Sequence, residues 1–229
     1  MTAPPVLHLD AHLLAVDKPP GRLVIPGRVA GEPSLREELE AVHGRLWVVH
    51  RLDRGTSGVL VFARSAEAHR ALNLAFERGE PRKRYLALVR GAPPDEQRLE
   101  APIAQGRKGR MRAVEPGDPR GKPSATRVRC LERFAERPWT GGALALVEAL
   151  PETGRTHQIR VHLAWAGTPL AVDPDYGEAG PLAAPGGAAL ARTPLHAARL
   201  ELPHPAGGAL TLEAGLPADL AAVLAELRR

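Results

Sequence analysis

The stretch His50-Arg51-Leu52-Asp53-Arg54-Gly55-Thr56-Ser57-Gly58 decides the fold, because it separates two short apolar runs at residues 46–49 and 59–63. Both runs are rich in β-branched and aromatic residues, a composition typical of buried strands. The polar nonapeptide is therefore expected to be a loop between two core strands. A loop of this kind holds its carboxylate, Asp53, on a rigid support from which it can reach a cleft. A structural ion pair of Asp53 with Arg51 or Arg54 is the alternative interpretation.

The 229 residues suffice for one large domain or two intimate subdomains with a real core. The net charge of +5 favours an anionic partner, although a GC-rich genome enriches arginine in the same way. The single cysteine, Cys130, excludes an internal disulfide and a cysteine metal cluster. Neither a leader-like N-terminus nor an apolar run approaching the roughly 18 residues of a membrane span is present. We expect a cytoplasmic monomer that does not contact a membrane.

Apolar periodicity outlines the rest of the chain. Strands are expected at 6–10 and 12–16 around a tight turn, at 85–89, and at 143–150. Ser34 and Glu37 have the spacing of a capping box, which predicts a helix over 34–43 with Leu35, Leu39 and Val42 on one face. Further helices are expected after Ser65, over 161–165 and over 217–229. The Ala-, Gly- and Pro-rich residues 178–193 are expected to be a poorly specified excursion. With no repeat or linker in view, the prediction is a single domain over 1–229.

Two lysines lie beside features that suggest chemistry. Lys18 precedes Pro19-Pro20-Gly21, which fixes an extended segment and then a turn, so this lysine is held at a strand end. A surface lysine on a strand edge would have the same pattern. Lys83 stands two residues before Tyr85 at the start of a strong strand. A purely structural interpretation makes Tyr85 an aromatic residue packed on the sheet.

Residues from about 103 to 129 hold more surplus positive charge than the whole chain. Phosphate contacts from such a segment provide affinity and register but little sequence information. A solvated hairpin would look similar. The cations are Arg107, Lys108, Arg110, Arg112, Arg120, Lys122, Arg127 and Arg129, and nearby acids are Glu115 and Asp118.

The longest polar signal is the segment Thr-Gly-Arg-Thr-His-Gln-Ile-Arg at residues 153–160. Gly154 permits a turn, and Arg155 and His157 supply hydrogen-bond donors. Arg160 precedes an apolar continuation that can be helical. The residues alone leave open whether Arg155 or Arg160 reaches Asp53.

These motifs together resemble the RluA-type pseudouridine synthases, which are RNA-modifying enzymes. The resemblance rests on His-Arg-Leu-Asp-x-x-Thr-Ser-Gly at 50–58, Lys-Pro-x-Gly at 18–21, Lys-x-Tyr at 83–85, residues 153–160, and Pro-Leu-x-x-Asp-x-x-Tyr-Gly at 169–177. The motifs occur in family order, and the match runs from residue 6 to about 205. It leaves no room for the separate N-terminal RNA-binding domain of many relatives, so a compact form is expected. The implied fold is α+β: a mixed, largely antiparallel sheet in two abutting halves, flanking helices, and a central RNA cleft with Asp53 at its floor.

The resemblance also implies roles for individual residues. Asp53 is expected to be the catalytic carboxylate, Arg160 to pair with it and keep it ionised, and Tyr85 to pack against the target base. Ile159 is expected to line the base pocket, and Arg51 to fill the gap left by the flipped nucleotide. Further RNA contacts are expected from His50, Lys18, Lys83, Arg155 and His157 and, in the basic segment, which matches the family's RNA-gripping insertion, from Arg107, Lys108 and Arg110.

Pseudouridine formation detaches uracil, turns it and rejoins it through carbon 5, and it requires no metal, redox cofactor or nucleotide. The nine histidines do not cluster along the chain at metal-ligand spacings. No cofactor or metal is therefore expected, and the expected partner is structured RNA, a ribosomal or transfer RNA stem-loop. A catalytically silent RNA-binding or RNA-folding factor is the rival interpretation. A hydrolase using Asp53 as nucleophile is a third, but no water-activating partner stands at a recognisable spacing.

Overall fold

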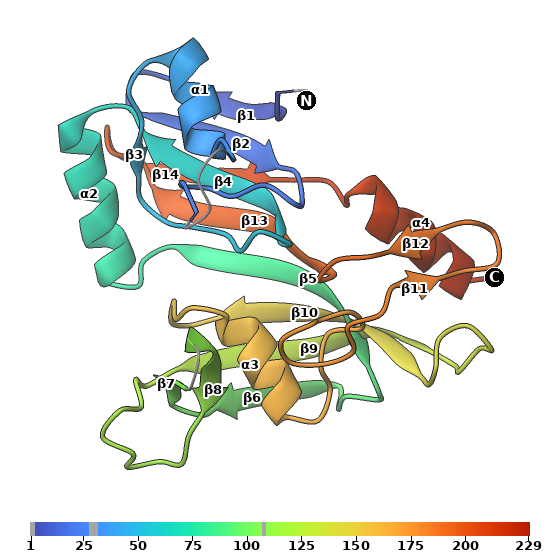
Figure 1. Ribbon diagram of the computed structural model, residues 1–229. Coiled ribbons are helices and arrows are strands. Elements are labelled where there is room, and N and C mark those ends of the chain that lie inside the picture. Colours follow the sequence, from blue (N-terminus) through green and yellow to red (C-terminus); the bar gives the residue numbers. More distant parts are fainter. Residues whose placement is uncertain (1–2, 28–31, 107–108) are drawn as a thin grey trace. The chain divides into compact units, whose positions relative to one another are not determined.

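The computed structural model describes residues 3–27, 32–106 and 109–229 (Figure 1). The chain forms two compact units. Unit 1 comprises Met1–Lys83 and His196–Pro217, and unit 2 comprises Arg84–Leu195 and Ala218–Arg229. Helices and largely antiparallel strands occur in both, so the α+β class is confirmed. The single domain and the central cleft stay predictions.

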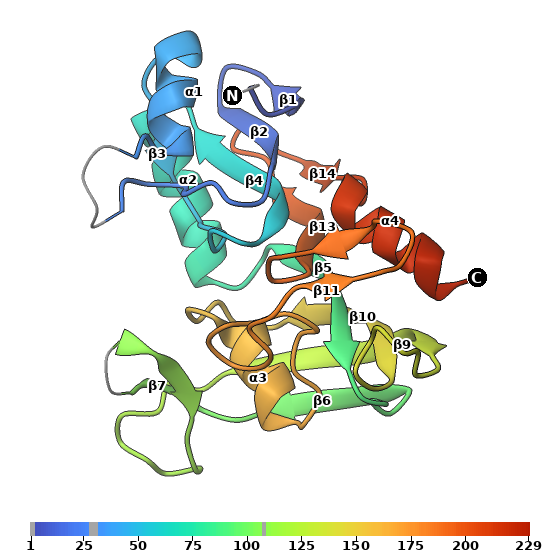
Figure 2. The same cartoon turned by 45° about the vertical axis from the view of Figure 1, so that its right-hand side comes forward.

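Unit 1 is built on strands that meet in the order β1-β2-β4-β13-β14, with the short β3 also paired to β4. The β4–β13 pair is parallel, and the other pairs described in this unit are antiparallel. Helices α1 and α2 complete the unit (Figures 1 and 2). Its elements are β1 (Val6–Leu9), β2 (Leu13–Lys18), α1 (Leu35–His43), β3 (Trp47–Val48), β4 (Ser57–Ala63), α2 (Ala66–Glu77), β13 (Leu195–Pro203, beginning in unit 2) and β14 (Ala209–Glu213).

The core of unit 1 forms around β4, whose residues are all buried. Val59 and Val61 of this strand pack with Ala68 and Leu72 of α2, so the helix covers one face of the strand. The predicted capping box of α1 is present, with the Ser34 side chain accepting from the Glu37 amide, and the predicted cap of α2 is present at Ser65. These contacts hold both helices at the positions that the apolar pattern predicts.

The prediction that Val42 lies on the buried face of α1 is wrong. Leu35 and Leu39 are buried, but Val42 is 76% exposed. The helix ends at His43, and the next apolar residue to enter the core is Leu46, beyond the helix. Val42 therefore lies on the solvent side of the last turn.

Unit 2 is an antiparallel sheet with strand order β5-β10-β9-β6. Two small hairpins, β7–β8 and β11–β12, and the helices α3 and α4 complete it. Its elements are β5 (Arg82–Arg90, beginning in unit 1), β6 (Glu96–Glu100), β7 (Ile103–Gln105), β8 (Met111–Ala113), β9 (Ala125–Phe134), β10 (Leu144–Pro151), α3 (Gln158–Trp165), β11 (Leu182–Ala183), β12 (Ala189–Leu190) and α4 (Ala218–Leu227).

The sheet of unit 2 is buried on both faces, because alternate residues of a strand point to opposite sides. Leu144 and Leu146 of β10 pack in one cluster with Leu220 and Leu224 of α4. The residues between them on β10 pack in a second cluster together with α3. This two-sided burial explains why the sequence of β10 alternates only weakly.

Gly58 provides a test of the parallel β4–β13 pair. Its φ of +109° lies in a region that disfavours side chains, and an added Cβ would lie 2.2 Å from the Ala197 carbonyl oxygen. We expect Gly58→Ala to lower the thermal unfolding midpoint strongly. Gly44→Ala is the matched control, since Gly44 also has positive φ but open space around it. Equal midpoints for the two variants would contradict this packing.

Candidate active site

Asp53 opens a tight turn in unit 1. The Thr56 amide donates to the Asp53 carbonyl oxygen at 3.1 Å, which closes the turn over Arg54 and Gly55. Leu52 is buried and fixes the turn to the core, whereas Asp53 is half-buried and Arg51 is exposed. The predicted loop between two strands is confirmed, and it presents a carboxylate with an exposed arginine two residues before it.

Lys18 holds this turn from below. Its side chain is 0% exposed, and its Nζ donates to the carbonyl oxygens of Pro19, Arg54 and Thr56 at 3.0, 3.2 and 2.7 Å. A buried ammonium is stable only when its donors are satisfied in this way. The expectation that Lys18 contacts RNA is therefore corrected. Its depth leaves no surface for a phosphate, and its charge instead orders the backbone on either side of Gly55.

The end of the turn is fixed by a second buried contact. Ser57 Oγ lies 3.0 Å from His196 Nδ1, and His196 Nε2 lies 3.1 Å from the Ala214 carbonyl oxygen. Nε2 can donate to this carbonyl, and Nδ1 shares a hydrogen bond with the serine hydroxyl. Both side chains are fully buried, so the pair supports structure and offers no accessible nucleophile. Nearby Asp17 has a raised pKa because of burial, partly opposed by His196.

His50 also has a structural contact where the sequence predicted RNA. Its Nε2 accepts the Val61 amide at 3.0 Å, and its ring stacks on Phe76 with centroids 5.1 Å apart. Burial, with a smaller contribution from the charge of Lys83, lowers the pKa of His50 to about 3. The ring is thus neutral at pH 7, and an RNA contact by His50 stays a prediction. Lys83 itself lies 5.9 Å from the Phe76 ring centroid, and burial lowers its pKa.

Tyr85 and Ile159 lie on the same side of unit 2. Tyr85 is half-buried on β5 and packs against the apolar cluster that contains Ile159 of α3. Because Ala87 and Val89 follow Tyr85 at alternate positions, all three residues face α3. The two residues expected to bound a base therefore share one apolar surface.

Arg160 is buried and paired within unit 2. Its Nε and Nη2 donate to the two carboxylate oxygens of Asp173 at 2.8 and 2.7 Å, and Nη2 also reaches Asp175 Oδ2 at 2.7 Å. Its guanidinium carbon lies 4.9 Å from the centroid of the Tyr176 ring. Burial alone would raise the pKa of Asp175, but Arg160, with smaller contributions from His157 and Arg110, holds it below its usual range.

Asp173 is a site residue that sequence reasoning missed, since residues 169–177 were interpreted only as a structural loop. Asp173 is fully buried, and its Oδ1 also accepts the backbone amides of Asp175 and Tyr176. The signal was the segment's matching position in the family, but only the fold shows the bidentate pair. The expected pairing of Arg160 with Asp53, which belongs to the other unit, stays a prediction. Arg155 is exposed and donates to the Pro123 carbonyl oxygen at 3.3 Å.

The start of α3 depends on a strained residue. His157 has a φ of +55°, a left-handed conformation that is uncommon for a residue with a side chain. Its Nδ1 lies 2.9 Å from the Tyr176 hydroxyl oxygen, which also accepts the Met111 amide at 3.1 Å. Gln158 donates to the Ala125 carbonyl oxygen at 2.9 Å and thereby ties the helix to β9. His157 is thus held by the protein itself, whereas the sequence predicted an RNA contact.

The basic segment forms the β7–β8 hairpin and the first part of β9. Arg110 donates from Nη2 to the carbonyl oxygens of Pro174, at 3.1 Å, and Asp175. It therefore anchors the hairpin to the loop that carries Asp173. Arg107 and Lys108 lie outside the described residues. On either side of them in the chain, the Gly106 amide donates to the Arg110 carbonyl oxygen.

Acids from β10 and the residues after it neutralise part of this positive charge. Glu148 and Glu152 pair with Arg129 and Arg127, in addition to the local pair of Arg120 with Asp118. Glu115 and Asp118 are thus not the only acids that offset the basic segment, and its unpaired positive charge is smaller than the sequence predicted. In the described part of the chain, Arg112 and Lys122 are exposed cations of this segment without a salt bridge.

Two further features concern the expected absences. Spacing along the sequence showed no histidine cluster, but the fold gathers His8, Asp10 and His204 of unit 1, whose potential ligand atoms lie within 4.8 Å of one another. Across the described ranges, no helix has the length and apolar character to cross a bilayer.

The neutral, buried ring of His50 predicts acid sensitivity. The unfolded chain takes up a proton near pH 6.5, whereas the folded protein does so only near pH 3. Folding stability from His50 is therefore fully present above about pH 6.5 and is lost progressively as the pH falls toward 3.

We expect thermal midpoints measured from pH 7.5 to pH 4 to fall less steeply for His50→Gln than for the unmodified protein. Glutamine can still accept the Val61 amide but does not titrate. His43→Gln, which alters a histidine at the end of α1, serves as the control and should keep the original slope. Identical slopes for all three proteins would contradict the buried neutral state of His50.

Comparisons with known proteins agree with these motifs. Residues 12–165 match the family model described as RNA pseudouridylate synthase. The chain is 39% identical to ribosomal large subunit pseudouridine synthase D of Nitrosomonas europaea, over 97% of this chain and 65% of the relative. It is 36% identical to ribosomal large subunit pseudouridine synthase C of Escherichia coli K12, over 97% of this chain and 70% of the relative.

Comparison with solved structures also points to pseudouridylate synthases. The structure of human RNA pseudouridylate synthase domain containing 4 matches with a TM-score of 0.75 and 25% identity, covering 98% of this chain and 93% of the human one. The chain spans about two thirds of the length of the curated relatives it matches. With the family model covering more than half of its residues, and with curated relatives 39% and 36% identical over 97% of the chain, the chain belongs to the RNA pseudouridylate synthase family.

Proposed function

We propose that this protein isomerises uridine to pseudouridine at one or a few positions in structured RNA, with Asp53 as the catalytic carboxylate. The observation that carries the proposal is the Asp53 turn, which the buried Lys18 and the Ser57–His196 contact hold rigidly while the carboxylate stays half-buried. Rigid placement is what a reacting group needs, because small displacements weaken catalysis strongly.

The reaction requires an ionised carboxylate and a nearby positive charge. Enclosing a carboxylate beneath a substrate disfavours its charged form, and an arginine partner opposes this penalty. Arg160 suits that role because Asp173 fixes its guanidinium through two hydrogen bonds and Tyr176 packs against it. Arg155, exposed and bound to a backbone carbonyl, suits contact with RNA better. Asp53 either attacks the sugar or acts on the base.

A flipped uracil would pack on the apolar surface that Tyr85 and Ile159 share. Extracting a base from its stack costs a few kcal/mol, which a side chain filling the gap offsets in part. Arg51 is exposed beside Asp53 and is the candidate for that role. Tyr85 would bound the base from the β5 side.

The RNA itself is proposed from the relatives. Those described above are named for the ribosomal large subunit, which favours ribosomal RNA over the transfer RNA stem-loop that the sequence left open. Arg112 and Lys122 of the basic segment would contact its phosphates, together with Arg107 and Lys108. Action as a cytoplasmic monomer without a metal in catalysis remains part of this proposal.

A catalytically silent RNA-binding factor is the rival function. Such a factor needs the basic segment but not the buried supports beneath Asp53. The retention of Asp53, Tyr85 and Arg160 together, each held by specific packing or hydrogen bonds, favours the enzyme.

Replacement of the carboxylate separates the two functions. We expect Asp53→Asn to bind RNA as the unmodified protein does but to lose pseudouridine formation by several orders of magnitude. The measurement is release of tritium from carbon 5 of labelled uridine in ribosomal RNA, alongside a filter-binding assay. Asp95→Asn, at a surface pair with Arg133, should keep full activity. Full activity in Asp53→Asn would remove it from the central role, and an inactive unmodified protein would favour the silent factor.

The unpaired cations of the basic segment provide a test of RNA binding. Replacing Arg112 and Lys122 with alanine should weaken binding and reduce the slope of log affinity against log salt concentration by about 1 to 2, because each phosphate contact releases counterions.

The matched control is Arg228→Ala with Arg229→Ala, which removes the same charge from residues that pair with Glu132 and Glu226. It should leave the salt slope unchanged. Equal slopes for both double variants would show that the basic segment is only a solvated face.

A further inference from the structure

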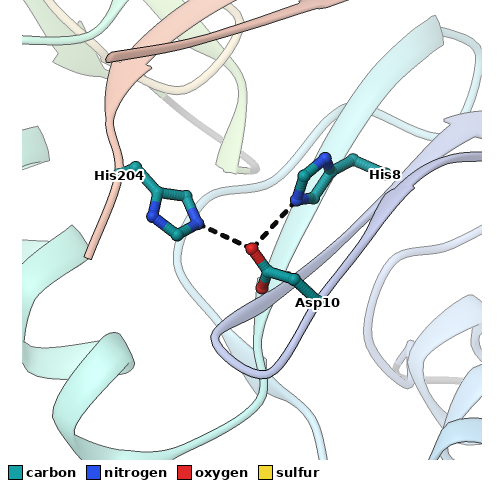
Figure 3. Close-up of side chains that lie close together, drawn as sticks. All are labelled: His8, Asp10 and His204. Atoms are coloured by element: carbon teal, nitrogen blue, oxygen red, sulfur yellow. Dashed lines mark hydrogen bonds and ion pairs between the residues drawn. The ribbon is translucent and has the colours of Figure 1, made fainter. Parts of the chain in front are cut away.

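Three side chains of unit 1 converge on one carboxylate oxygen (Figure 3). Asp10 Oδ2 lies 3.0 Å from His8 Nε2 and 2.7 Å from His204 Nε2. Asp10 stands in the turn between β1 and β2, and His204 in the turn between β13 and β14. All three residues are half-buried, so they are fixed in place but accessible to a small solute.

The local backbone orients the carboxylate. Asp10 Oδ1 accepts the amides of His12 and Leu13 at 2.7 and 2.8 Å, which leaves Oδ2 for the two imidazoles. The carboxylate is therefore held in one orientation, with Oδ2 directed toward both imidazole rings.

We propose that His8, Asp10 and His204 form a binding site for a divalent transition-metal ion of the Zn²⁺ class. Two imidazole nitrogens and one carboxylate oxygen are ligands that Zn²⁺ uses, with a water completing a four-coordinate site. The three ligand atoms already lie within 4.8 Å of one another and come from two separate hairpin turns. Neutral histidines and one carboxylate leave the bound ion with a net charge of +1.

Binding requires two small adjustments. Ligands held at roughly 2.0 to 2.2 Å from Zn²⁺ lie about 3.4 Å apart in a tetrahedron, so the side chains must separate by about half an ångström. His204 Nδ1 accepts the Ala206 amide at 3.2 Å, so its proton is on Nε2 in the metal-free ring. Coordination at Nε2 moves the proton to Nδ1 and releases the exposed Ala206 amide to water. Gly207 and Gly208, both with positive φ, give this turn the freedom to adjust.

The position of the site points to a structural role. His204 and Asp10 are 194 residues apart in the chain, and a metal joining them would bind the folded state, in which the two turns meet. The site lies at the Leu13 end of β2, whereas Lys18 and the Asp53 turn lie at the other end, roughly 20 Å away at the rise of a strand. The ion would thus fasten β1–β2 to β13–β14 without reaching the reacting carboxylate.

The donor set makes the site selective. Arg64 donates to the Asp10 carbonyl oxygen and adds positive charge that opposes all divalent cations alike, so the two imidazole nitrogens decide the preference. The His12 ring packs edge-on against His204 with centroids 5.5 Å apart and limits the space on that side. Nitrogen-preferring ions should therefore bind in preference to Mg²⁺ or Ca²⁺.

The test is a Zn²⁺ titration of the full-length, tag-free protein after chelation, followed by calorimetry and by the thermal midpoint. We expect about one equivalent to bind and the midpoint to rise, because the ion binds the folded state. His8→Ala and His204→Ala should each weaken binding by roughly tenfold or more. His43→Ala should bind as the unmodified protein does.

Asp10→Asn preserves an oxygen acceptor for the turn amides and should also weaken binding. Co²⁺ added to the unmodified protein should give the visible absorption of a tetrahedral site and should not do so with His204→Ala, provided that this variant retains its circular dichroism spectrum. No binding to the unmodified protein, or affinity in His8→Ala and His204→Ala equal to that of the unmodified protein, would overturn the proposal and leave the three side chains as a hydrogen-bonded contact between turns.

Discussion

A buried positive charge determines the shape of the Asp53 turn. Lys18 brings an ammonium group into the core of unit 1, where each unsatisfied donor would cost free energy of folding. Its acceptors are the backbone carbonyl oxygens of Pro19, Arg54 and Thr56, so the same three hydrogen bonds satisfy the lysine and hold the turn. The prolines after Lys18 and the glycine at position 21, whose amide donates to the Arg54 carbonyl, complete the same arrangement. The exposed chemistry of residues 51–53 depends on this hidden contact.

Unit 2 places Tyr85 of β5 and Ile159 of α3 on the same side of its sheet. Burial of both sheet faces uses α4 on one side and α3 on the other. Tyr85 takes the α3 side because of strand alternation, and α3 brings Ile159 to that side and carries Arg160 next to it. The strained His157 and the clamp by Gln158 fix where the helix begins. Small errors at that start would rotate the guanidinium.

The sequence predicted the elements with strong local signals and the motif positions. The capped helices, the central loop and the paired strands of both units follow from periodicity and caps. It missed β6, β9, β11, β12 and β14, which are short or rich in charge. It also expected an RNA contact from Lys18, whose side chain is buried, because a motif shows which residues matter but not which way a side chain turns. Asp173 and the His8–Asp10–His204 group escaped detection since their partners are distant in sequence.

The attachment of the β7–β8 hairpin to residues 174–176 has a consequence for engineering. Arg110 and Met111, at the loop end of the hairpin, bind the same short segment whose aspartates hold Arg160, so this end of the hairpin and the arginine's support are one piece. A chimera that takes this hairpin from a relative must bring the matching segment with it, or retain Arg110 and Tyr176 at the junction. The hairpin and the segment are therefore exchanged as a pair, about 65 residues apart in the chain.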